Sequence, residues 1–174
     1  MSLPNSFETE RLVLRPTSIE DAQFIFELMN SPKWLAYIGD RGVNSKEDAE
    51  EYIKARMLPQ FERLGYGNYT VTRKEDDHQL GTCGLYDREG LEGVDIGFAF
   101  LPGFENQGYG YESASLLRDA AFSKFGLKKL NAITVMENFA SQKLLEKLGL
   151  EFVELIKLEG DDEKLMFYQM IMRK

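Results

Sequence analysis

Apolar residues recur along the chain with two different spacings, and the change of spacing predicts where strands and helices lie. Alternation of apolar and polar residues, or a short continuous apolar run, is typical of strands, whereas apolar residues three or four positions apart indicate one face of a helix. The first criterion predicts seven strands, at residues 10–15, 69–73, 80–86, 94–100, 129–135, 152–158 and 165–172. The second predicts four helices, at residues 19–30, 46–58, 111–124 and 139–148.

Residues that favour helix ends support these boundaries. Thr17 with Glu20, and Ser45 with Asp48, have the spacing of a capping box before the first and second helices. Pro59 is expected to end or kink the second helix, because proline lacks a main-chain N–H and its ring crowds the preceding turn.

The order of the elements indicates the fold class. One strand and two helices are followed by three strands, a helix, a strand, a helix and two strands. This order predicts a single α+β (mixed α/β) domain over residues 1–174, with a mostly antiparallel sheet of about seven strands and about four flanking helices.

Composition narrows the class of protein. The 174 residues are 43% hydrophobic and 29% charged, as in ordinary globular proteins, and carry a formal net charge of −8. The negative charge argues against a nucleic-acid partner and is compatible with a cationic substrate. Neither a membrane-spanning run nor a signal-peptide pattern is present, so we expect a cytoplasmic protein without a membrane partner. One cysteine and one histidine predict no metal site.

The stretch GFENQGYGYESAS, residues 103–115, places Gly108 and Gly110 directly before a predicted helix. The first turn of a helix presents free N–H groups and a partial positive charge, and glycines allow an anion to approach the backbone. A plain turn would account for the glycines equally well. No GK[ST] follows, which excludes a Walker-type loop, and the preceding antiparallel strands argue against a dinucleotide fingerprint.

The segment LPGFENQGYGYESA resembles the cofactor-binding segment of the GNAT superfamily of N-acetyltransferases, with Pro102, Gly108 and Gly110 at the family's positions. Glu105 stands where that family usually has Gln or Arg. NFASQKLLEKLGLEF, residues 138–152, and the opening FETERLVLRPTSIEDA are similar to the branch that acetylates ribosomal-protein N-termini. Together these segments extend over nearly the whole chain in the family's order.

The resemblance implies the GNAT fold, with acetyl-CoA as co-substrate and no metal. The loop amides would hold the diphosphate, from Asn106, Gln107, Gly108, Tyr109, Gly110 and Tyr111. The strand before the loop would separate from the following strand and line the pantetheine arm, through Phe98, Ala99, Phe100 and Leu101. Asn138 would hydrogen-bond the same arm, although it is also a favoured N-cap residue.

Acyl transfer from a thioester requires removal of a proton from the amine and protonation of the leaving thiolate. Asp95 is the predicted base, with Glu92 as the second choice; the alternative for Asp95 is a solvated carboxylate on a half-exposed strand. His78 lies in an expected exposed turn and is discounted. Cys83, in the middle of a strand, is expected to be a buried small hydrophobe and not a nucleophile.

Many GNAT relatives supply the proton from a tyrosine at the position of Leu145. Ser141 is therefore the predicted proton donor or thiolate-orienting group; the alternative is a serine that merely occupies the first helical turn.

The resemblance also implies that Trp34 and Tyr37 wall the acceptor pocket, although aromatic residues at these positions also suit a core. The predicted acceptor is the α-amine of a protein N-terminus. The alternatives are a small amine such as a polyamine or amino sugar, a non-catalytic acetyl-CoA sensor, and a structural domain without a ligand. The sequence leaves a monomer and a homodimer equally open.

Overall fold

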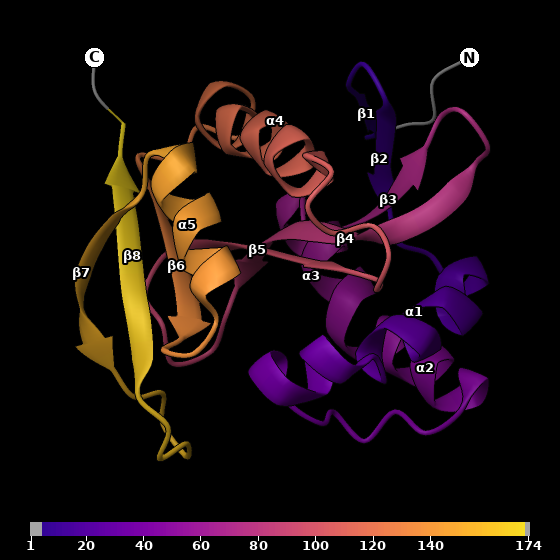
Figure 1. Cartoon of the computed structure of the whole chain (residues 1–174), viewed down its shortest axis with the longest axis horizontal. Helices are drawn as coiled ribbons and strands as arrows, with labels where there is room; N and C mark the ends of the chain where they lie inside the picture. The colour runs from indigo at the N-terminus through magenta and orange to yellow at the C-terminus, as the bar shows by residue number, and fades with distance from the viewer. Residues whose placement is uncertain (1–4, 173–174) are drawn as a thin grey trace.

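An eight-stranded sheet extends through the molecule (Figure 1). The structure is a computed structural model and describes residues 5–172. In chain order the strands are β1 Phe7–Glu8, β2 Leu12–Pro16, β3 Asn68–Arg73, β4 His78–Asp87, β5 Val94–Phe100, β6 Lys129–Val135, β7 Glu151–Ile156 and β8 Leu165–Ile171. Their order across the sheet is β1-β2-β3-β4-β5-β6-β8-β7, and every neighbouring pair is antiparallel except β5 and β6.

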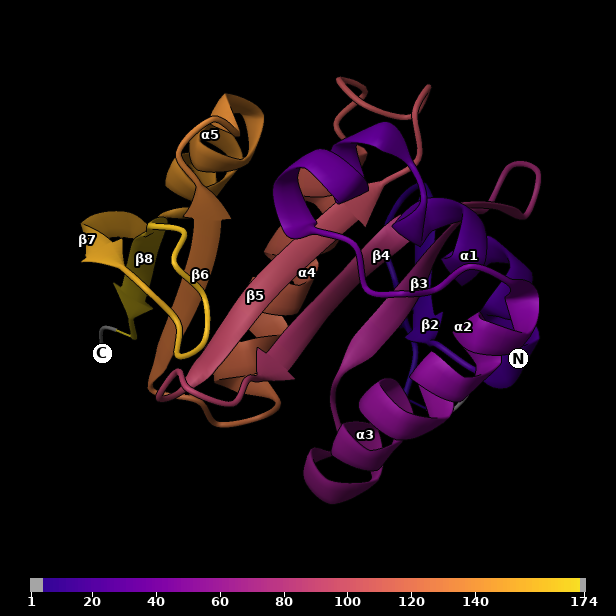
Figure 2. The same ribbon diagram turned by 90° about the horizontal axis from the view of Figure 1, so that it is seen from below.

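Helices cover both faces of this sheet (Figures 1 and 2). They are α1 Ala22–Met29, α2 Lys46–Tyr52, α3 Leu58–Leu64, α4 Tyr109–Ser123 and α5 Phe139–Leu148. One buried cluster joins α4 and α5 to the sheet, and a second joins α1 and α2 to the end of β5. The mixed α+β class is confirmed, with one strand and one helix more than the pattern predicted. No helix within residues 5–172 is both long and apolar enough to cross a membrane.

The first helical segment begins at Ile19, as predicted, but its cap is one residue later than predicted. Ser18 is the N-cap of a short 3₁₀ turn, and its N–H donates to the Asp21 carboxylate at 2.9 Å. Thr17 was predicted to cap this helix, but its buried hydroxyl instead hydrogen-bonds the Thr70 hydroxyl at 2.8 Å. Thr17 is therefore engaged with the neighbouring strand β3 through Thr70, and Ser18 takes the cap position.

The second helical region is continuous but irregular. Its predicted cap is confirmed, since the Ser45 hydroxyl accepts a hydrogen bond from the Asp48 N–H at 3.0 Å. A wide π turn, Ile53–Met57, joins α2 to α3. Pro59 does not end the helical region, which continues to Leu64, but the π turn lies just before it, as expected where a proline removes an N–H donor and crowds the preceding turn.

The sheet opens between β5 and β6. Along the described residues these two strands pair at a single position, Asp95 opposite Asn131, whereas β5 pairs with β4 over its whole length. Figure 2 shows β5 and β6 separating toward their carboxyl ends. This single parallel pairing leaves one edge of the second half of β5 without a neighbouring strand.

Every second residue of β5 directs its N–H and C=O groups toward the gap, and the others direct theirs toward β4. Leu101 donates its N–H to the Leu80 carbonyl on the β4 side. Main-chain groups of successive residues in a strand point to opposite edges, so those of Phe98 and Phe100 point toward the gap. The fold therefore places unpaired N–H and C=O groups beside the opening.

Candidate active site

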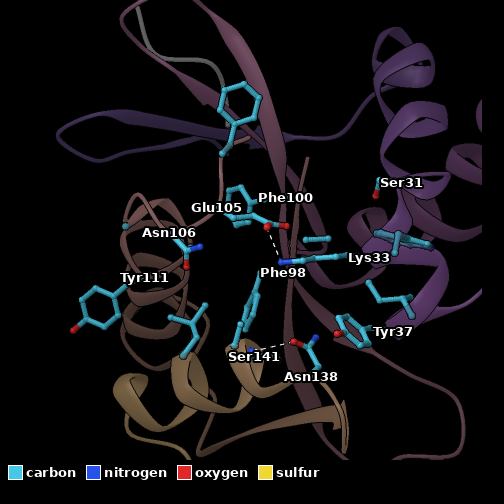
Figure 3. A pocket seen from close by; sticks show the side chains of 18 of the residues that line it. Ser31, Lys33, Tyr37, Phe98, Phe100, Glu105, Asn106, Tyr111, Asn138 and Ser141 are labelled. Atoms are coloured by element: carbon cyan, nitrogen blue, oxygen red, sulfur yellow. Dashed lines mark hydrogen bonds and ion pairs between the residues drawn. The ribbon is translucent and has the colours of Figure 1, made fainter. Parts of the chain in front are cut away.

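A cavity of about 280 Å³ lies at the carboxyl end of β5. Its walls come from the end of β5, the loop that follows, the start of α4, one side of α5 and the π turn Trp34–Ile38 (Figure 3). The structure brings together here eleven of the residues that the sequence predicted for the site: Trp34, Tyr37, Phe98, Ala99, Phe100, Asn106, Gly108, Gly110, Tyr111, Asn138 and Ser141.

Three predicted cofactor residues do not line the cavity. The Gln107 side chain folds back and donates to the Gly103 carbonyl at 2.7 Å. The Tyr109 ring is buried beneath the Arg11 guanidinium, 4.3 Å from the ring centroid. Leu101 packs against the core cluster of α1 and α2. These side chains hold the loop in place, so any contribution to binding comes from their main-chain groups.

Asp95, the predicted base, is not brought to the cavity. Its carboxylate is 1% exposed and accepts two hydrogen bonds from the Arg88 guanidinium, at 3.2 and 3.0 Å. Burial raises the pKa of Asp95 above its ordinary value, against the lowering effect of Arg88. Glu92 is exposed on the preceding loop, and His78 packs its ring 5.0 Å from Phe104. Asp95, the predicted base, therefore lies outside the cavity, and its carboxylate ties β5 to Arg88 in the loop between β4 and β5.

The two glycines of the loop have different roles. Gly108 is the N-cap of α4 and has a φ of +85°, which an L side chain adopts only with strain. A Cβ on Gly110 would lie 3.1 Å from the Leu144 Cδ2, so this glycine allows close approach of α4 and α5. Gly108 therefore shapes the turn into α4, and Gly110 sets the space between α4 and the side chain of Leu144.

The start of α4 offers main-chain donors to the cavity. Within the described residues, the N–H groups of Gly108 to Tyr111 make no hydrogen bond, and the first α4 bond is from Glu112 N–H to the Gly108 carbonyl. Arg11 anchors this turn, since it donates to the Gln107 carbonyl at 3.0 Å and to Glu112 at 2.8 Å. Four free donors and the helix dipole make this turn suited to an anion.

Asn138 and Ser141 lie together on the opposite wall. The Asn138 Oδ1 accepts from the Ser141 N–H at 3.2 Å and so caps α5, as predicted. The Asn138 amide nitrogen and the Ser141 hydroxyl make no hydrogen bond within the described part of the chain, and both residues line the cavity. Leu145, at the position of the family's tyrosine, is buried in the core. Ser141 is therefore the free hydroxyl on this wall.

The cavity is also lined by two lysines, Lys33 and Lys147, that the sequence analysis did not single out. Lys33 donates to Glu105 at 2.6 Å, and Lys147 lies 4.3 Å from the ring centroid of Tyr111. Glu105 was noted only as a departure from a family pattern. No local signal marks Lys33, because its partner is 72 residues away in the chain.

The comparisons with known proteins agree with this geometry. Residues 11–151 match the Acetyltransferase (GNAT) domain family. The chain belongs to the GNAT acetyltransferase family. Among curated relatives, an uncharacterized N-acetyltransferase of Bacillus subtilis, YnaD, is 26% identical over 142 residues, which is 82% of this chain and 80% of that protein.

Solved structures share the fold of this GNAT chain. An acetyltransferase from Agrobacterium tumefaciens has a TM-score of 0.82 at 24% identity, covering 99% of this chain and 96% of the other. RimL, a ribosomal L7/L12 α-N-protein acetyltransferase in complex with coenzyme A, has a TM-score of 0.79 at 18% identity. A spermidine N-acetyltransferase from Vibrio cholerae, in complex with CoA and spermine, has a TM-score of 0.76 at 16% identity. Each of the last two pairs covers 94% of this chain and 96% of the other.

The cavity of this GNAT chain fits the chemistry of acetyl-CoA. The unpaired main-chain groups of Phe98 and Phe100 are suited to the amides of a pantetheine arm, and the free donors of Gly108 to Tyr111 are suited to a diphosphate. Within residues 5–172, no cluster of three or more His, Cys, Asp or Glu side chains is arranged to hold a metal ion.

Proposed function

We propose that this N-acetyltransferase acts on the α-amine of a protein or peptide N-terminus, in a ternary complex with acetyl-CoA. The observation that carries the proposal is the meeting of the free β5 edge and the free amides of α4 in one cavity. The resemblance of the segment at residues 138–152 to the ribosomal-protein branch supports this choice of acceptor.

Each wall of the cavity has a role in this proposal. The α4 amides hold the diphosphate, while Phe98, Phe100 and Asn138 orient the arm. Acetyl-CoA supplies an acyl group that is already activated as a thioester, so the chain has to provide position more than chemical activation. Ser141 places a hydroxyl on the α5 wall, where it donates its proton to the departing sulfur and takes up the proton that the amine nitrogen loses as the amide forms, which restores the hydroxyl.

The charged side chains that line the cavity favour an acceptor amine of low pKa, which loses its proton readily. Among the described lining residues, the carboxylate is Glu105, and Lys33 holds it in an ion pair. An α-amine has a pKa of about 7.7–8.0, compared with about 10.4 for a lysine-like amine, so more of it is neutral at pH 7. A cavity without a free base therefore favours an N-terminal α-amine.

A small polyamine is the second candidate acceptor. The formal net charge of −8 attracts a polycation, and the spermidine N-acetyltransferase from Vibrio cholerae shares the fold. This candidate requires a route for proton removal from an amine of high pKa, for which the cavity offers no free carboxylate among its described residues.

An acceptor screen tests the proposal. Thiol release from acetyl-CoA is measured with peptides that begin with Ser, Ala or Met, with spermidine and with an amino sugar. We expect release with at least one peptide, rising with pH as the α-amine loses its proton. Release with spermidine alone would favour the second candidate. A thermal shift with CoA but no release with any amine would indicate a sensor, and no shift would contradict the cofactor site.

A further inference from the structure

An ion pair links the two sides of the cavity. Lys33 lies between α1 and the π turn Trp34–Ile38, and its ammonium donates to the Glu105 carboxylate at 2.6 Å. Glu105 belongs to the loop between β5 and α4, and Figure 3 shows the contact beside Phe98 and Asn106. The pair therefore connects the loop that offers free amides to the segment that carries Trp34 and Tyr37.

The charge on the loop is opposite to what an anion requires. Residues 102–110 include one carboxylate, Glu105, and contain no Lys or Arg. A diphosphate beside the free amides would be repelled by Glu105 unless that charge were neutralised. Lys33 is the cation in contact with Glu105, whereas the ammonium of Lys147 lies over the Tyr111 ring.

The pair is also easily broken. The Lys33 side chain is 56% exposed and that of Glu105 is 29% exposed, so water screens the attraction, and a pair of this kind contributes little free energy. A phosphate group offers more negative charge and more acceptor oxygens than a carboxylate. A phosphate bound by the loop that carries Glu105 would therefore be a stronger partner for Lys33 than Glu105 is.

We propose that Lys33 exchanges partners when the cofactor binds: it pairs with Glu105 in the free protein and with a phosphate of CoA in the complex. This inference rests on the proposed function. Because Lys33 directly precedes Trp34, the exchange draws the turn Trp34–Ile38 with it and shapes the acceptor side of the cavity.

The chain contains a built-in probe of this movement. Trp34 is its one tryptophan, and the turn that holds it begins immediately after Lys33. The indole Nε1 is buried and has no hydrogen-bond partner within the described residues, so no such bond fixes the ring. Intrinsic fluorescence therefore reports on the acceptor-side turn without a label.

The test compares CoA binding by calorimetry in the wild type, Lys33→Gln, Glu105→Gln and Lys46→Gln, an exposed control lysine in α2. Loss of one exposed ion pair to a phosphate predicts that Lys33→Gln weakens CoA binding about fivefold, and removal of the repelling charge predicts that Glu105→Gln strengthens it about threefold. CoA should change the Trp34 emission of the wild type and of Lys46→Gln, but not that of Lys33→Gln.

The signs of these effects decide the outcome. If both Glu105→Gln and Lys33→Gln weaken CoA binding, the ion pair stays closed over the cofactor and the exchange is wrong. Wild-type affinity and an unchanged Trp34 response in Lys33→Gln would overturn it as well. If the wild type itself does not bind CoA, the proposed function fails, and that result is distinct from either of the others.

Discussion

Arg88 donates two hydrogen bonds to the buried carboxylate of Asp95, and this pair lies at the single position where β5 and β6 are paired. The relationship is structural, because Asp95 does not line the cavity. It accounts for a buried carboxylate near the start of β5 without assigning that carboxylate a part in catalysis.

Replacement of Asp95 by Asn should therefore reduce stability and spare the chemistry. Breaking a buried ion pair leaves Arg88 without its partner, and we expect a loss of about 3 kcal/mol in the free energy of unfolding, measured by urea denaturation. The pH profile of acetylation per folded molecule should remain that of the wild type. The exposed Glu92→Gln serves as the control. A profile displaced in Asp95→Asn alone would restore Asp95 as the base.

Glu112 makes stability dependent on acid pH. Burial raises the pKa of Glu112, but hydrogen bonds from Thr9 and Arg11 outweigh it and hold the pKa below its ordinary value of 4.5. A carboxyl group with a lowered pKa in the folded state stabilises the protein fully above the unfolded pKa and loses that effect as the pH falls through the folded value. The wild type should therefore lose stability below about pH 4.5.

The variant Glu112→Gln isolates this contribution. It should unfold about 1–2 kcal/mol more easily than the wild type at pH 7, because charged hydrogen bonds to a partly buried carboxylate are lost. The difference should narrow toward pH 3, as measured by thermal unfolding at several pH values. A constant difference across this range would show that the charge of Glu112 has no role.

Replacement of Gly110 by Ala should change the affinity for CoA without lowering the stability of the fold. A Cβ at this position would lie 3.1 Å from Leu144 and 3.7 Å from Phe100, both of which line the cavity. Gly110→Ala should weaken CoA binding about tenfold, whereas alanine in the first turn of α4 should leave stability unchanged or slightly raised. The double variant with Leu144→Ala restores space and should recover part of the affinity. Unchanged binding in Gly110→Ala would argue against a cofactor in this part of the cavity.

Ser141→Ala tests the proposed proton donor. The Ser141 N–H, which donates to Asn138, is retained, so the α5 cap and the thermal stability should not change. Loss of a positioned general acid should lower kcat about 100-fold while the KM for acetyl-CoA stays within about twofold. Ser141→Thr, which keeps a hydroxyl, should recover part of the rate. Full turnover by Ser141→Ala would limit this residue to the helical turn.

The sequence predicted the fold well where nearby residues alone determine an element. The apolar runs at Val94–Phe100 and Lys129–Val135 gave the bounds of β5 and β6, and Asn138 marked the start of α5. The two residues of β1 are too few to show alternation. The π turn Trp34–Ile38 has no sequence signal of its own, whereas the π turn Ile53–Met57 lies just before Pro59, where the sequence predicted an end or a kink.

The candidate site was predictable to a similar extent. Gly108, Gly110 and Asn138 belong to short segments whose conformation is local, and the structure places all three in the cavity. The partners that change the interpretation come from elsewhere in the chain. Lys33 reaches Glu105 across 72 residues, and even Arg88, which is only seven residues before Asp95, meets it only once the loop between β4 and β5 is formed. Pairings of this kind arise only when the chain is folded.

The gap between β5 and β6 is also an unpaired strand edge that does not lie at the perimeter of the sheet. An unpaired strand edge at the perimeter of a sheet is a template for another chain, and proteins protect such edges. Here the free edge of β5 lies in the middle of the sheet, and α5 forms the wall beside it. Anything that approaches this free edge therefore meets α5 beside it. The protein thereby keeps main-chain groups available for recognition inside the sheet, and the strands open to another chain are those at its perimeter, β1 and β7.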